Sequence, residues 1–203
     1  YLMRCLIHVG SHHTGTTSLQ KILSDQSDYL KNIGIIYPES IKKGLQHSLL
    51  PGAYLPNHFS LQKNRSLNVD FYIQKLKEEI EHLNFKLCLI SSEVFTELIR
   101  LKKHELYELF NKLETIFDDI SIMYTFRDYR ERSFSAQKAQ IRLSSSNKIF
   151  RTDVFNAPER FRNKVIGSEI EISEWKKLKK KFIVLNMKDS ETPILMYVNS
   201  IID

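Results

Sequence analysis

Residues 6–18 read LIHVGSHHTGTTS, an apolar strand-like run followed by a small polar loop and the start of a helix. Gly10 and Gly15 bound the loop. Successive backbone N–H groups in such a loop can point inward, and the unpaired amides and dipole of a helix start favour an anion. The stretch therefore predicts a cradle for a phosphate or a similar group.

The glycine spacing fits the phosphate-loop template G-x-x-x-x-G-K-[ST], but Thr16 stands where that template requires a lysine. This departure disfavours an ordinary ATPase or GTPase. The run instead resembles the 5′-phosphosulfate loop of the sulfotransferase family, a lysine and any residue followed by Gly-Thr-Thr. Here it reads His13-Thr14-Gly15-Thr16-Thr17.

The resemblance implies that the sulfate donor is PAPS (3′-phosphoadenosine 5′-phosphosulfate), that the product is PAP (3′-phosphoadenosine 5′-phosphate), and that no metal is needed. It places the 5′ end of the donor on the loop and the helix start. The donor-binding residues expected there are Ser11, His12, His13, Thr14, Gly15, Thr16, Thr17 and Ser18.

A second motif lies in residues 121–135, SIMYTFRDYRERSFS, where a strand again ends in charge and opens a helix. It resembles the family's 3′-phosphate motif, an arginine just past a strand and a serine eight positions later. Arg127 and Ser135 have that spacing. A guanidinium offers a planar fork of donors to phosphate oxygens, and a serine two turns into the helix adds a hydroxyl on the same face. The resemblance implies that both bind the 3′-phosphate.

The expected general base is Glu93, which ends an apolar run at the edge where the ligand is predicted, and which matches the part of the fold where the family has a histidine or glutamate base. Glu93 could also cap the next helix or pair with an arginine. His47 and His58 are the alternative bases, because histidine titrates near neutrality. His8 lies inside the first strand and is expected to be a hydrogen-bonded core residue.

The main departure from the family is His13, which replaces a permanently charged lysine. An imidazole carries charge only part of the time near neutral pH, although a nearby anion would raise its pKa. Two interpretations stay open. His13 acts as an acid toward the bridging oxygen of the donor, or it marks a protein that binds the nucleotide and transfers slowly or not at all.

Strand-like and helical patterns alternate along the chain, which indicates an α/β fold with three layers, a central parallel sheet flanked by helices, of the P-loop-like sulfotransferase type. A long aperiodic stretch at residues 39–68 is expected to shape the acceptor site. The expected strands are residues 3–9, 35–37, 87–90, 120–126 and 182–186. The expected helices begin after the loop at residue 16 and at residues 71–83, 103–117, 170–180 and 192–202.

The composition sets further bounds. With 203 residues, 42% of them hydrophobic, the chain is expected to form a single domain over residues 1–203, without the carboxyl-terminal stretch that closes over the nucleotide in the family. No apolar run is long enough to span a bilayer, and Cys5 and Cys88 lie in apolar runs, so we expect a cytoplasmic protein with reduced core cysteines. The net charge of +6 favours polyanions, but the basic residues do not interleave with aromatic ones, so no nucleic-acid partner is expected.

Three functions remain. The first is a PAPS-dependent sulfotransferase acting on a hydroxyl or amine of a glycan or small metabolite. The second is a P-loop kinase or nucleotide hydrolase, with Asp128 as the acid that would hold Mg²⁺. The third is a non-catalytic nucleotide-binding module, suggested by His13. Oligomeric state is left open.

Overall fold

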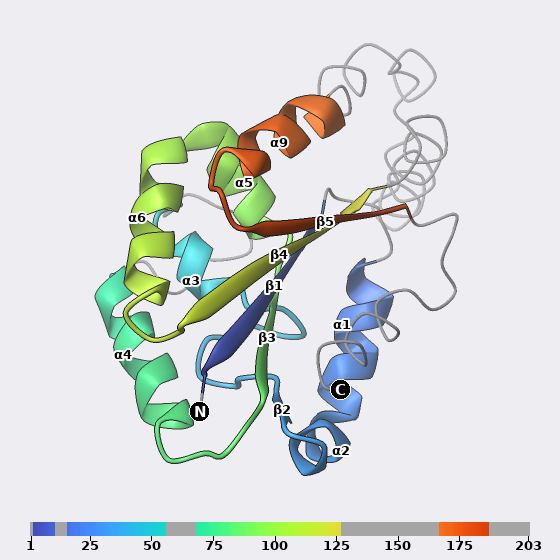
Figure 1. The fold of residues 1–203 in the computed structure, drawn as a ribbon, viewed down its shortest axis with the longest axis vertical. Helices are drawn as coiled ribbons and strands as arrows, with labels where there is room; N and C mark the ends of the chain where they lie inside the picture. Colours follow the sequence, from blue (N-terminus) through green and yellow to red (C-terminus); the bar gives the residue numbers. More distant parts are fainter. Residues whose placement is uncertain (1, 11–15, 56–67, 127–166, 187–203) are drawn as a thin grey trace, which may run out of the picture.

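A five-stranded parallel sheet lies between two layers of helices in the computed structural model, which describes residues 2–10, 16–55, 68–126 and 167–186 (Figure 1). The strands are β1 (Arg4–Gly10), β2 (Ile35–Ile36), β3 (Leu87–Ser91), β4 (Asp119–Phe126) and β5 (Lys181–Asn186). The helices are α1 (Thr16–Asp25), α2 (Ser27–Asn32), α3 (Leu49–Gly52), α4 (Val69–Ile80), α5 (Val94–Leu101), α6 (Lys103–Leu113) and α9 (Gly167–Lys176). The predicted three-layer α/β class with a parallel sheet is confirmed.

The sheet order is β2-β3-β1-β4-β5, so β1 lies at the centre. Every side chain of β3, and every residue of β1 after Arg4, is buried. Parallel strands that are covered on both faces show this pattern, and it explains why their sequences are nearly continuous apolar runs. The predicted strands therefore agree with the observed ones to within about a residue at each end.

Helices lie on both faces of the sheet (Figure 1), and one hydrophobic cluster fills the space on each face. On one face, α1 and α2 pack Leu23 and Leu30 against Leu6 and Leu89. On the other face, α4, α5, α6 and α9 contribute to a larger cluster. It includes Ile7 and the other side chains of β1 that point to this face. Alternate residues of a strand point to opposite faces, so each central strand supplies both clusters.

Local sequence signals explain several helix ends. The side chain of Asn68 caps α4 by accepting a hydrogen bond from the Phe71 N–H at 3.0 Å. Gly34 follows α2 with a φ of +84°, and its N–H donates to the Lys31 carbonyl, so a glycine ends this helical segment. Ile22 and Leu83 are exposed, although their helical spacing would allow them to face the core.

Buried polar contacts hold α9 against the sheet. Arg100 of α5 forms an ion pair with the buried carboxylate of Glu171, which also accepts a hydrogen bond from the hydroxyl of Tyr124 on β4. Beside this contact, the fully buried indole of Trp175 meets the ring of Phe110 with 6.3 Å between centroids. The element after residues 127–166 is thus fixed to both β4 and α5.

Cys5 and Cys88 are register partners on β1 and β3, and both are buried free thiols. Burial raises the pKa of the Cys5 thiol, which keeps it protonated and unreactive. Within the described ranges, no helix has the length and apolar character needed to cross a membrane. The helix expected at residues 192–202 lies outside the described residues.

Candidate functional site

The candidate site lies at the carboxyl ends of β1 and β3, which are neighbours in the sheet. After β1 the chain continues to α1 on one face, and after β3 it continues to α5 on the opposite face. Connections that leave adjacent parallel strands on opposite faces open a crevice at the strand ends, and open α/β sheets bind their ligands there.

Thr16 and Glu93 meet across this crevice. Thr16 is the first residue of α1, and its hydroxyl donates a hydrogen bond to the Oε1 atom of Glu93. Glu93 comes after Ser92, which is the first residue after β3. Thr16 is buried and Glu93 is partly buried. A side-chain hydroxyl at the start of α1 thus already donates to a carboxyl oxygen. Thr17 and Ser18, also in the first turn of α1, are exposed.

Glu93 does not cap the helix that follows it. Its side chain makes no capping hydrogen bond to α5. The hydroxyl of Ser92 performs that role, because its Oγ accepts a hydrogen bond from the Val94 N–H at 3.2 Å. The Glu93 carboxyl group instead contacts the hydroxyl of Thr16 at the start of α1.

A row of buried polar side chains lies under the crevice, and we call His8, Gln20, Ser91 and Thr125 the polar row. Ser91 Oγ is 2.8 Å from Nδ1 of His8, and the side-chain amide of Gln20 donates to the same oxygen at 3.2 Å. Nε2 of His8 is 3.2 Å from Oγ1 of Thr125. The row thus links α1, β3, β1 and β4 at the edge of the sheet where the ligand is expected.

The proton positions in the polar row follow from the acceptors available. The Thr125 hydroxyl donates to the Val9 carbonyl at 3.4 Å, so Nε2 of His8 carries the ring proton and donates to Thr125. Nδ1 then accepts the proton of the Ser91 hydroxyl. Burial lowers the pKa of His8 to about 4, which keeps this ring neutral. The prediction that His8 is a hydrogen-bonded core residue is confirmed.

His47 is fully buried on the edge of β3 away from β1. Its Nδ1 accepts the Ser91 N–H at 2.9 Å, and its Nε2 donates to the Pro38 carbonyl at 2.8 Å. Its own N–H donates to the Ser91 carbonyl at 2.8 Å. Burial lowers the pKa of the His47 imidazole to about 3. Both ring nitrogens are therefore engaged in holding the end of β3, which leaves this ring poorly placed to accept a proton from a substrate.

Other predicted site residues fall in stretches that the structure does not describe. They are Ser11, His12, His13, Thr14, Gly15, His58, Arg127, Asp128 and Ser135. What the structure does provide is their point of attachment. Residues 11–15 come between Gly10 of β1 and Thr16 of α1 in the sequence, and Arg127 directly follows the last residue of β4.

Sequence reasoning missed Gln20, Ser91 and Thr125 as parts of the site. A signal for each is present. Gln20 lies one helical turn after Thr16 on the buried stripe that continues to Leu23, and the other two are polar residues at the ends of apolar strands. A polar residue on an otherwise apolar face is expected to need a buried partner.

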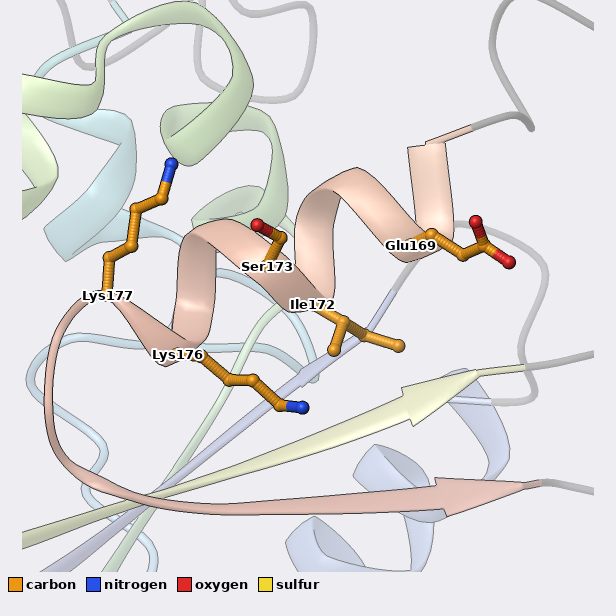
Figure 2. Close-up of a pocket in the computed structure, with 5 residues that line it drawn as sticks. All are labelled: Glu169, Ile172, Ser173, Lys176 and Lys177. Carbon is orange, nitrogen blue, oxygen red and sulfur yellow. The ribbon is translucent and has the colours of Figure 1, made fainter.

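A separate hollow of about 490 Å³ lies along α9, lined by Glu169, Ile172, Ser173, Lys176 and Lys177 (Figure 2). Figure 2 shows the carboxylate of Glu169 at one end of the helix and the two lysine ammonium groups at the other. Lys177 also pairs with Glu174 at 2.5 Å. Because the charged groups do not converge on one point, this hollow is not built as a ligand site. Over the described ranges, no three His, Cys, Asp or Glu side chains gather so that they could hold a metal ion.

The fold is similar to that of a solved protein. The crystal structure of a sulfotransferase from Alicyclobacillus acidocaldarius superimposes with a TM-score of 0.59 and 15% sequence identity, over 96% of this chain and 77% of that one. No family model matches the sequence, and the comparison with curated proteins found no match either. The chain thus has a sulfotransferase-like P-loop α/β fold, and the likeness at this identity concerns the fold.

Proposed function

We propose that this protein is a sulfotransferase that moves a sulfuryl group from PAPS to a hydroxyl or amine of a glycan or small metabolite. The observation that carries the proposal is the meeting of Thr16 and Glu93 at the crevice between β1 and β3. A helix start that already holds a carboxylate oxygen is suited to a phosphosulfate oxygen, and the carboxylate beside it is suited to the role of a base.

The proposed reaction uses two groups of this chain, Glu93 and His13. Glu93 takes the proton of the acceptor O–H or N–H, and the acceptor atom forms a bond to sulfur. The bond between sulfur and the bridging oxygen breaks, and its electron pair stays on the phosphate of the product. His13, when protonated, hydrogen-bonds that oxygen or gives it a proton, which stabilises the developing charge.

The remaining donor contacts come from the two ends of the nucleotide. The loop of residues 11–15 and the first turn of α1, with Thr17 and Ser18, would hold the 5′ end. Arg127 and Ser135 would hold the 3′-phosphate. Both motifs follow strands that pair with each other, β1 and β4, so one nucleotide can lie across the two strand ends.

Glu93 is favoured over His47 as the base because of their surroundings. The His47 ring is completely buried, and both its nitrogens hold backbone groups. Glu93 is partly exposed at the crevice. The free buried thiols of Cys5 and Cys88 fit a reducing compartment such as the cytoplasm, where a sulfotransferase could meet a soluble acceptor.

The test is calorimetric titration with PAP and with ADP, each with and without Mg²⁺. We expect PAP to bind tightly without the metal and ADP to bind weakly. A magnesium-dependent preference for ADP would overturn the proposal in favour of phosphoryl transfer. A third outcome is that PAP binds but PAPS is not consumed with any acceptor screened, and that replacing Glu93 changes nothing. That outcome would indicate a non-catalytic binding module.

A further inference from the structure

Two contacts join α1 to the end of β3, one helical turn apart. The first is the Thr16–Glu93 hydrogen bond, and the second is the hydrogen bond from Gln20 to Ser91. Thr16 and Gln20 are four residues apart on the same face of α1, and Ser91 lies two residues before Glu93. The two contacts therefore resemble two rungs between α1 and the chain at the end of β3. We call the Thr16–Glu93 bond the outer rung and the Gln20–Ser91 bond the inner rung.

The outer rung lies where the donor is proposed to bind. If the Thr16 hydroxyl turns to an oxygen of the sulfate donor, the Thr16–Glu93 bond opens, while the Gln20–Ser91 bond between α1 and β3 remains. Gln20 is 3% exposed and Ser91 is 0% exposed, so water does not compete for the inner rung. The inner rung can thus hold the helix start in place while the outer one exchanges partners.

Ser91 is the centre of the inner rung. Its hydroxyl accepts from Gln20 and donates to His8, and its backbone N–H and carbonyl are both bonded to His47. His8 passes the chain of hydrogen bonds on to Thr125 of β4, which precedes Arg127 by two residues. This chain of hydrogen bonds therefore connects the ends of β1, β3 and β4 with α1.

Stability alone does not account for this arrangement. Two residues before His8, Ser91 and Thr125, the same face of the three strands carries the apolar residues Leu6, Leu89 and Met123. These side chains belong to the hydrophobic cluster between the sheet and α1 and α2. Replacing hydrogen-bonded partners by apolar groups of similar shape is often neutral for stability. The hydrogen-bonded polar residues His8, Ser91 and Thr125 lie near the carboxyl ends of their strands, where hydrogen bonds fix direction as well as distance.

We propose that Gln20, Ser91 and His8 are positioning residues that hold the start of α1 against the end of β3, and so keep the donor-binding hydroxyl of Thr16 in register with the base Glu93. This inference rests on the proposed function for its ligand, but the geometry that it asserts belongs to the free protein. Donor binding and the local rigidity of the helix start are the two properties that the polar row should control.

The test uses the full chain with Ser91→Ala, which removes the hydroxyl, and Ser91→Thr, which restores one. Gln20→Met is the milder variant, since it removes the hydrogen-bond donor of the side chain and keeps the side chain's length. The control is Ser24→Ala, which removes a hydrogen bond at the other end of α1, where Ser24 accepts from Lys42 at 2.9 Å. Amide hydrogen exchange of the free protein and PAP affinity are measured beside the free energy of unfolding.

We expect Ser91→Ala and Gln20→Met to speed exchange at residues 16–20 and 91–93 about tenfold and to weaken PAP binding about tenfold. Ser91→Thr should restore both properties, and Ser24→Ala should change neither. The effects of Ser91→Ala and Gln20→Met should also be less than additive when combined, because both remove the same hydrogen bond.

Exchange that rises equally over the whole sheet, in step with the unfolding free energy, would overturn the inference and leave the polar row a stabilising contact only. Unchanged exchange at the helix start would overturn it as well. If the wild-type protein does not bind PAP but the local exchange changes as expected, then the proposed function fails while the positioning role stands.

Discussion

His47 and the backbone of Ser91 form two hydrogen bonds with each other, one from the Ser91 N–H to Nδ1 of the imidazole and one from the backbone N–H of His47 to the Ser91 carbonyl. β2 ends at Ile36, so the edge of β3 lacks a strand partner at Ser91. His47 satisfies both backbone groups there. A residue that sequence reasoning offered as a base thus completes the sheet beside the candidate site.

Acid should destabilise the fold through His47 and His8. Burial lowers the pKa of His47 to about 3 and that of His8 to about 4, whereas the unfolded values lie near 6.5. Between these values the unfolded chain binds more protons, so stability is complete above about pH 7 and falls as the pH decreases toward 4. We expect each ring to account for about 2 kcal/mol between pH 7 and 5, measured by urea unfolding.

The matched variants are His47→Gln and, on the exposed surface, His82→Gln. His47→Gln should reduce the dependence of stability on pH, and it should also cost about 1–3 kcal/mol at pH 7 because the buried Ser91 N–H loses its acceptor. His82→Gln should leave both quantities as in the wild type. A pH dependence that is unaltered by His47→Gln would contradict the neutral state assigned to this ring.

Glu93→Gln should spare donor binding and reduce turnover. The Gln side chain keeps an oxygen that can accept from Thr16, but it cannot take a proton from the acceptor. We expect kcat to fall by about 10²–10⁴-fold while the affinity for PAP stays within about threefold. Glu97→Gln, one turn further along α5, is the control and should retain activity. Unaltered turnover in Glu93→Gln would transfer the role of base to another residue, with His58 as the next candidate.

Arg127→Ala should weaken the binding of nucleotides that carry a 3′-phosphate far more than the binding of nucleotides with a 3′-hydroxyl. A guanidinium that makes charge-assisted hydrogen bonds to a phosphate contributes on the order of 10²-fold in affinity. The measurement compares the dissociation constants of PAP and AMP for the wild type and the variant. Equal weakening of both nucleotides would rule out the 3′-phosphate assignment.

His13→Lys restores the residue found in the sulfotransferase family. A lysine keeps its charge at a pH where an imidazole has lost its proton, so we expect the variant to keep or gain activity on the alkaline side, while the wild type declines. The measurement is a profile of kcat against pH from about 6 to 9. Loss of activity in the variant at high pH would indicate a role for the histidine that a fixed charge does not replace.

Much of the fold was predictable from the sequence, because buried parallel strands and amphipathic helices leave strong periodic patterns. The continuous apolar runs of β1 and β4 are examples. The helix α5 was not predicted, because only two residues separate it from β3, and neither is a glycine or proline that would mark a boundary.

The candidate site was predictable only in part. The proposed donor-binding start of α1 and the proposed base Glu93 follow from local motifs, and the structure brings Thr16 and Glu93 together across 77 residues of sequence. The polar row could not be predicted as a unit, because its bonds join positions that only the strand register places side by side. His8 pairs with Ser91 through the β1–β3 register, and Thr125 lies on the next strand. For His47, residue type suggested chemistry, and only its burial revealed a structural role.

The smaller of the two hydrophobic clusters, between the sheet and the pair α1 and α2, depends on α1, which begins at the candidate site. Within the described part of the chain, α1 and α2 cover one face of the sheet, and Leu23 and Leu30 are their buried anchors. A ligand held at the first turn of α1 therefore restrains the cover of that face as well as the crevice. Occupancy should be visible as resistance to heat, and a catalytically silent variant that still holds the nucleotide should melt at a higher temperature in its presence.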